Sequence, residues 1–166
     1  GEPRMSMQTL GARRMRNRVA LALLVGAALR IGTFAVYQPW RPSVTKNVVL
    51  TTDAIWQHRL AVNLSAGHGF SIYAEPPYAP HLIVPPLCPA LLAGLYTACG
   101  AHPWIGVLYN VILSIASIAL FGVFLWVLTG AATPTSIGVW LMALSPTFIA
   151  HANSLLMEQT YKTQKS

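Results

Sequence analysis

Charge is what this sequence has least of. Lys, Arg, Asp and Glu make up 9% of its 166 residues, whereas soluble domains carry roughly 25%. Not one of the four residue types occurs from Pro76 to Met157. Hydrophobic residues, by contrast, make up 54% of the chain. A soluble domain of this size could not bury so much apolar surface, so the composition argues against a water-soluble globular protein and favours a membrane protein.

Acidic residues are the scarcest charged group, because four Asp and Glu face eleven Lys and Arg and leave a net charge of +7. Five of the basic residues precede the first apolar run, namely Arg4, Arg13, Arg14, Arg16 and Arg18. The positive-inside rule makes such a cluster typical of a cytoplasmic flank. A nucleic-acid-binding domain would spread basic side chains over a folded face. The rest of the chain lacks them, so we expect no nucleic-acid partner.

Cysteine is nearly absent as well, and the two that occur are Cys88 and Cys99. On one helix they would lie about 16 Å apart along the axis, at 1.5 Å per residue. That separation is too large for a disulfide. Cysteine usage therefore says little about the compartment.

Three apolar runs approach the length of a membrane span, which is about 20 residues. They cover residues 19–37, 104–128 and 136–152. The first contains one charge, Arg30, which is expected either to snorkel to the far interface or to face the protein interior. Pro146 weakens the third run near its end. The fold class expected is all-α, a polytopic helical membrane protein with about three transmembrane helices.

The ends of the chain are polar by comparison. Residues 1–18 are expected to form a basic cytoplasmic tail without regular structure, and 19–157 the transmembrane domain. Residues 158–166 form a polar tail that looks like the truncation of a longer protein. With the N-terminus inside, the protein is expected to be a multi-pass protein of the plasma (inner) membrane.

Residues 38–103 are expected to form a structured outer loop with juxtamembrane helices. One helix should begin near Thr52 and stop at Gly67 or Gly69. Residues 84–99 are apolar but short for a span, so they predict a re-entrant or interfacial helix. If they cross the bilayer instead, the end of the chain lies on the inner face.

Four charged or polar side chains are the candidate site. Asp53 lies just outside the bilayer, where a carboxylate can act as a general base towards a hydroxyl, although a helix cap is the simpler interpretation. Arg59 can grip a phosphate, or merely snorkel at the interface, and His58 beside it completes the expected binding pair. Glu158 either ends a span or supplies a second acid.

The loop histidines are His58, His68 and His81, and their spacing does not match a metal site. Asn63-Leu64-Ser65 fits the N-glycosylation pattern but falls within the expected helix. Neither pattern adds a site.

Four stretches together resemble the GT-C superfamily of integral-membrane glycosyltransferases, and within it the protein mannosyltransferase and aminoarabinose transferase-like branch. In chain order they are "DAIWQHRLAVNLSAGHGFS", "VPPLCPALLAGLYTACG", "YNVILSIASIALFGVFLWVLTG" and "LMALSPTFIAHANSLLMEQT". The first is similar to a family pattern of an Asp, an aromatic pair and "A..L..G.GF". The second resembles the family's proline-rich segment, the third its next helix, and the fourth a segment that ends at a second acid. The resemblance covers residues 18–160.

The resemblance implies transfer of a sugar from a polyprenyl-phosphate carrier to a protein, glycan or lipid acceptor on the outer face of the membrane. Asp53 matches the family's first-loop base, and Glu158 matches its second acid, which would assist or bind a divalent metal ion. Arg59 and His58 would contact the donor. Such an enzyme is surrounded by membrane lipid. The resemblance implies no definite cofactor other than that metal ion.

Two departures from the family pattern stand beside the resemblance. Gln57 follows Trp56 where the family commonly has a Tyr, and the chain ends in polar residues where the family continues with an apolar helix. The alternatives are an inactive fragment, or a small membrane transporter or scaffold subunit that binds lipid phosphates.

Overall fold

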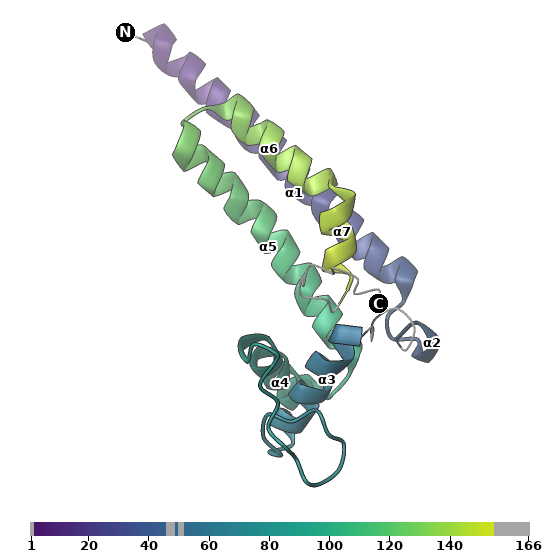
Figure 1. Cartoon of the computed structure of the whole chain (residues 1–166). Helices are drawn as coiled ribbons and strands as arrows, with labels where there is room; N and C mark the ends of the chain where they lie inside the picture. The colour runs from purple at the N-terminus through teal and green to yellow at the C-terminus, as the bar shows by residue number, and fades with distance from the viewer. Residues whose placement is uncertain (1, 46–48, 50–51, 155–166) are drawn as a thin grey trace, which may run out of the picture. The chain divides into compact units, whose positions relative to one another are not determined.

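The computed structural model describes residues 2–45, 49 and 52–154, and gives only the backbone of residues 2–14, 52 and 53. Its regular structure is helical, with no strand among the described residues. The helices, labelled in Figure 1, are α1 (Glu2–Tyr37), α2 (Pro42–Val44), α3 (Thr52–Ser65), α4 (Leu87–Cys99), α5 (Pro103–Thr129), α6 (Ala132–Leu144) and α7 (Pro146–Ala152).

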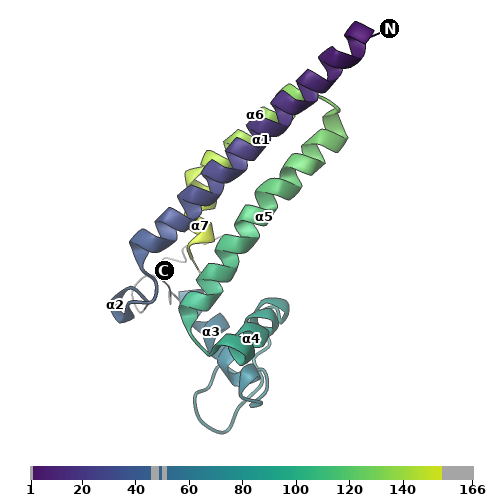
Figure 2. The ribbon, with the colours of Figure 1, turned by 180° about the vertical axis from the view of Figure 1, so that it is seen from behind.

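The described helices fall into two units, which we treat separately. The transmembrane bundle consists of residues 1–36 and 110–153, and the loop unit centres on residues 37–109. Within the bundle, α1, α5 and α6 run alongside one another in both ribbon views (Figures 1 and 2).

Two helical segments are long and apolar enough to cross a membrane, Met15–Tyr37 of α1 and Pro103–Thr129 of α5. The bent pair of α6 and α7 adds a third if it is counted as one span. Large apolar side chains point outward along these helices, as with Leu24, Leu120 and Val127, each more than two-thirds exposed. Lipid is the solvent that such a surface requires. The expected fold class, a helical membrane protein, is confirmed.

The N-terminal segment differs from its expectation. We expected residues 1–18 to lack regular structure, and this is wrong, because α1 begins at Glu2 and runs unbroken into the span. The segment is rich in strong helix formers such as Met, Gln, Leu, Ala and Arg. Its only proline, Pro3, lies in the first turn, where the missing N–H costs no hydrogen bond.

Small residues allow the bundle helices to approach closely. A Cβ added to Gly26 of α1 would lie 3.0 Å from both Ala143 Cβ and Ile118 Cδ1, so α1, α5 and α6 meet at this glycine. A Cβ on Gly138 of α6 would collide with the side chain of Leu125 on α5. Close packing of this kind holds membrane helices together where the hydrophobic effect cannot.

The third predicted span is interrupted at Pro146, the residue expected to weaken it. Helix α6 ends at Leu144, α7 begins at Pro146, and the two axes differ by 54°. Proline has no N–H to donate to the carbonyl four residues earlier, here that of Met142. The break therefore leaves carbonyls at the end of α6 without their usual helical partners.

The loop unit contains the two expected short helices. Helix α3 stops at Ser65, and Gly67 and Gly69 follow with φ of +80° and +83°, which glycine adopts without strain. Helix α4 covers 13 residues and falls short of spanning length. Pro89 is tolerated in its first turn for the same reason as Pro3. The interfacial or re-entrant interpretation of 84–99 agrees with this length.

Candidate functional site

The predicted catalytic acids lie at the limits of what the structure describes. Asp53 is the second residue of α3, so its backbone is in the first helical turn, but its side chain is outside the described atoms. Glu158 lies outside the described residues altogether. Their roles, and the divalent ion that Glu158 would bind, stay predictions.

The predicted binding pair lines one groove of the loop unit, with a volume of about 430 Å³. One wall is the face of α3 that carries His58, Arg59 and Asn63, and the other is the following segment. The described lining residues are Ile55, His58, Arg59, Val62, Asn63, Ala66, His68, Ile72, Tyr73 and Ala74. The groove thus combines one exposed cation with imidazole rings and apolar walls.

His58 is fixed by a partner on α4 that the sequence did not reveal. Its Nδ1 lies 2.8 Å from the phenol oxygen of Tyr96, and the two rings meet edge to face. Burial lowers the pKa of His58, and the positive charge of Arg59 lowers it further. Burial also raises the pKa of Tyr96. Both groups are therefore neutral near pH 7, and one donates a hydrogen bond to the other.

Asn63 holds the wall that faces α3. Its amide nitrogen donates to the carbonyls of Ser71 and Tyr73, at 2.5 and 2.9 Å. Asn63 is only 6% exposed, so its side chain is inaccessible to N-glycosylation in the folded protein. These two hydrogen bonds satisfy the buried amide nitrogen of Asn63.

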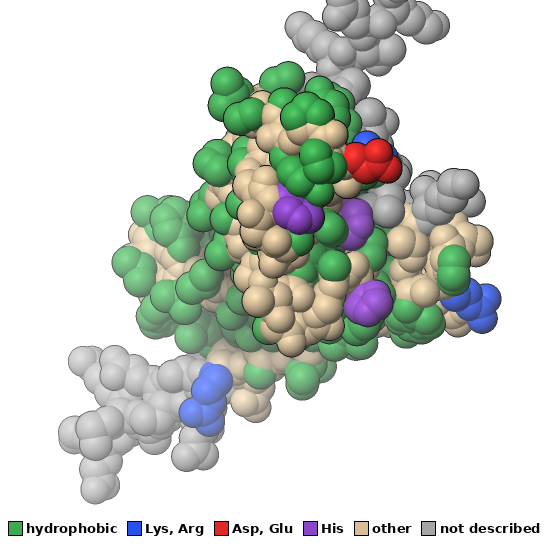
Figure 3. Space-filling view, turned by 90° about the horizontal axis from the view of Figure 1, so that it is seen from below, with side chains coloured by type: hydrophobic (Ala, Val, Ile, Leu, Met, Phe, Trp, Pro, Cys, Tyr) green, Lys and Arg blue, Asp and Glu red, His purple; other side chains and the backbone are tan. Residues whose placement is uncertain are grey.

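Aromatic rings also engage the other loop histidines. His68 stacks on Tyr78 with ring centroids 4.3 Å apart, and His81 meets Trp56 edge to face at 5.4 Å. Seen from below the view of Figure 1, histidine side chains lie among hydrophobic ones (Figure 3). Among the described residues, no group of three His, Cys, Asp or Glu could hold a metal ion.

A second polar cluster lies inside the transmembrane bundle, around Arg30. The sequence left open whether this arginine snorkels or faces inward, and the structure places it inside, with 0% of its surface exposed. Its Nε donates to Ser114 Oγ on α5 at 2.8 Å. Its terminal nitrogens donate to the carbonyls of Gly26, Ala143 and Met142 at 3.0, 3.0 and 3.3 Å. Each of these acceptors is a neutral oxygen.

Two of those carbonyls belong to the broken end of α6. Met142 and Ala143 lie within the last turn before Pro146, where the helix leaves carbonyls unpaired and carries partial negative charge. The guanidinium of Arg30 therefore caps α6 at the break. Asn153, just after α7, reaches back to the carbonyl of Arg30 at 3.5 Å. The cluster ties four helical elements together without a described acid.

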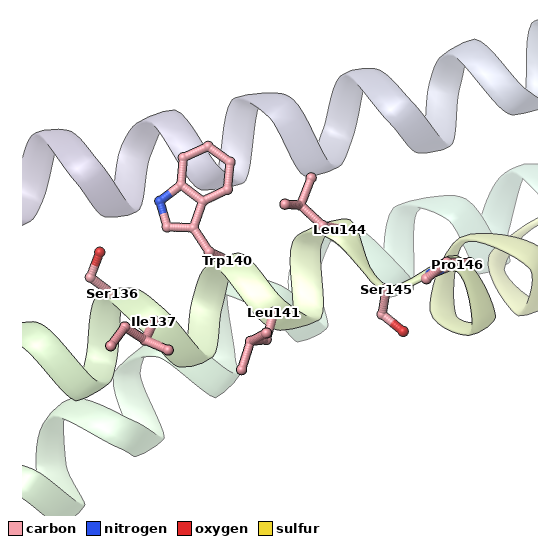
Figure 4. Close-up of a pocket in the computed structure, with 7 residues that line it drawn as sticks. All are labelled: Ser136, Ile137, Trp140, Leu141, Leu144, Ser145 and Pro146. Carbon is pink, nitrogen blue, oxygen red and sulfur yellow. The ribbon is translucent and has the colours of Figure 1, made fainter.

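A shallow groove of about 530 Å³ follows the outside of the same break. It is lined by Ser136, Ile137, Trp140, Leu141, Leu144, Ser145 and Pro146 (Figure 4). Trp140 and Leu144 point towards the ribbon of α1, and the hydroxyl of Ser145 lies at the bend. Among the described residues, those that line this groove carry no charge.

The sequence was also compared with known proteins. No protein-family model matches the chain, and neither a curated protein nor a solved structure matches it. The membrane-spanning helices thus identify the chain as a helical membrane protein, and its resemblance to the GT-C glycosyltransferases stays a prediction.

Proposed function

We propose that this chain belongs to an integral-membrane glycosyltransferase, which transfers a sugar from a polyprenyl-phosphate carrier to an acceptor hydroxyl on the outer face of the membrane. The observation that carries the proposal is the groove beside α3, where Arg59 and neutral His58 lie together. An exposed guanidinium above apolar walls suits a phosphate joined to a hydrocarbon chain.

The roles follow from the position of each residue along the chain. Arg59 binds the carrier phosphate, and His58, held by Tyr96, accepts or donates a hydrogen bond within the groove. Asp53 precedes them on the same helix and deprotonates or orients the acceptor hydroxyl. Glu158 assists as a second acid. The cluster of arginines before the first span supports, by the positive-inside rule, the proposal of a plasma (inner) membrane protein with a cytoplasmic N-terminus and with α3 on the outer side.

The test measures transfer of a radiolabelled sugar from polyprenyl phosphate by the full product of the gene that encodes this chain, in proteoliposomes. Asp53→Asn should abolish transfer and leave donor binding intact, because the amide keeps the shape of the side chain but cannot accept the proton. Arg59→Gln should weaken donor binding. Arg41→Gln is the matched control, because Arg41 is also exposed after the first span but lies outside the groove.

Transfer that persists in Asp53→Asn would remove Asp53 from the mechanism. Donor binding that never leads to transfer in the unaltered protein would instead favour a transporter or scaffold that binds lipid phosphates. Equal weakening by Arg41→Gln and Arg59→Gln would contradict the assignment of the groove.

A further inference from the structure

An apolar groove lies on the transmembrane bundle between α1 and α5, with a volume of about 560 Å³. It is lined by Met15, Arg16, Val19, Ala20, Leu23, Ala119, Gly122, Val123, Trp126 and Thr135. Only Arg16 and Thr135 are polar in this set, and the hydroxyl of Thr135 already donates to the carbonyl of Ala131. Arg16 is therefore the one charged group among the described residues of the lining.

The groove has the length and direction of part of a lipid chain. On α1 it extends from Met15 to Leu23, about 12 Å at 1.5 Å per residue, and on α5 from Ala119 to Trp126, about 10 Å. That is roughly a third of the hydrocarbon core, so the groove stays within one leaflet. The start of α1 and the end of α5 lie at the same end of the bundle (Figures 1 and 2). Arg16 and Trp126 thus mark its mouth, where arginine and tryptophan suit the membrane interface.

We propose that this groove binds an acyl chain of an anionic phospholipid, whose phosphate pairs with Arg16. The charge of Arg16 selects a negative headgroup, and the apolar walls below it take the chain. Arg18 lies close by in sequence but outside the lining, so of the two arginines of the flank whose side chains are described, Arg16 is the one at the groove.

The occupant is distinct from the proposed sugar donor. Helix α1 crosses the membrane between Arg16 and Tyr37, so the mouth of the groove and the chain after Tyr37 face opposite sides. The positive-inside rule assigns the Arg16 side to the cytoplasm, where anionic phospholipids attract basic residues. The proposal depends on α1 spanning the membrane and not on sugar transfer.

Trp126 provides the assay, because brominated acyl chains quench a tryptophan that they contact. The unaltered chain and Trp126→Phe are reconstituted into phosphatidylcholine vesicles that contain dibrominated phosphatidylglycerol or, separately, dibrominated phosphatidylcholine. The difference between the two proteins isolates the signal of Trp126. We expect phosphatidylglycerol to be preferred about fivefold, the factor that corresponds to about 1 kcal/mol for one basic side chain at a membrane surface.

Arg16→Gln should abolish this preference, and Arg16→Lys should keep most of it, because the positive charge remains. Arg18→Gln is the matched control, since it removes the same charge from an exposed position outside the groove, and it should leave the preference unchanged. Ala119→Phe, which fills the groove, should reduce quenching by both lipids. Circular dichroism verifies that each variant keeps its helix content.

Equal quenching by the two brominated lipids in the unaltered chain would overturn the proposal. Equal losses in Arg16→Gln and Arg18→Gln would do so too, because they would indicate surface charge rather than a site. Displacement of brominated phosphatidylglycerol by polyprenyl phosphate more effectively than by unlabelled phosphatidylglycerol would assign the groove to the carrier instead, and so refute the occupant proposed here.

Discussion

Arg30 is the residue whose replacement most directly tests the transmembrane bundle. In Arg30→Met the side chain keeps much of its length but donates no hydrogen bond, so Ser114 and the carbonyls of Met142 and Ala143 lose their donor. Hydrogen bonds between membrane helices contribute about 0.6 kcal/mol on average and up to about 1.7. Three such bonds total roughly 2–5 kcal/mol. Release of the buried charge offsets part of this loss, and we expect a net destabilisation of about 2 kcal/mol.

The decisive measurement is the coupling between Arg30 and Pro146. Pro146→Ala supplies the missing N–H, which can bond to the carbonyl of Met142 as a regular helix would. In that background Arg30→Met should therefore cost about 1 kcal/mol less, the equivalent of one such bond. The free energy of unfolding is measured by denaturant titration in mixed micelles for both single variants and the double variant.

Gly94→Ala gives the control cycle, because an added Cβ at Gly94 meets nothing within 4 Å and this residue lies in the loop unit. Its effect should add to that of Arg30→Met within about 0.5 kcal/mol. If the Arg30 and Pro146 effects add equally well, Arg30 does not cap the broken end of α6. A neutral Arg30→Met would likewise contradict the role of these hydrogen bonds.

Two further predictions concern the loop unit. Asn63→Ala should destabilise it by about 2 kcal/mol, because two carbonyls lose their donor, and should speed proteolysis between residues 66 and 86; unchanged cleavage would contradict the assigned role of Asn63. The lowered pKa of His58 means that the folded state binds fewer protons than the unfolded state, whose histidine titrates near about 6.5. Stability should therefore be complete above that pH and fall as the pH drops through it towards the folded pKa. Thermal unfolding at a series of pH values measures this loss of stability. His58→Gln should remove the loss, and Arg59→Gln should reduce it, because removal of the Arg59 charge raises the pKa of His58. Equal pH dependence in all three proteins would refute the assigned role of His58.

The sequence by itself determined the class of this protein and several element boundaries. A long uncharged apolar run is typical of a membrane span, and the helix over residues 103–129 was predicted from this pattern alone. The break at Pro146 and the helix stop before Gly67 follow from local chemistry, namely a missing N–H and a backbone with positive φ. The same local reasoning failed for residues 2–18, because charge suggested an unstructured tail whereas helix propensity continued α1 to Glu2.

Only the tertiary structure decided where the polar side chains go. Arg30 can snorkel or turn inward with equal ease as far as its own segment is concerned. The carbonyls that hold it inside belong to a helix end 113 residues away in the case of Ala143. His58 likewise finds Tyr96 on another helix, 38 residues on. Hydrogen-bond partners of this kind depend on which helices pack together, and periodicity and composition within one segment carry no record of that packing.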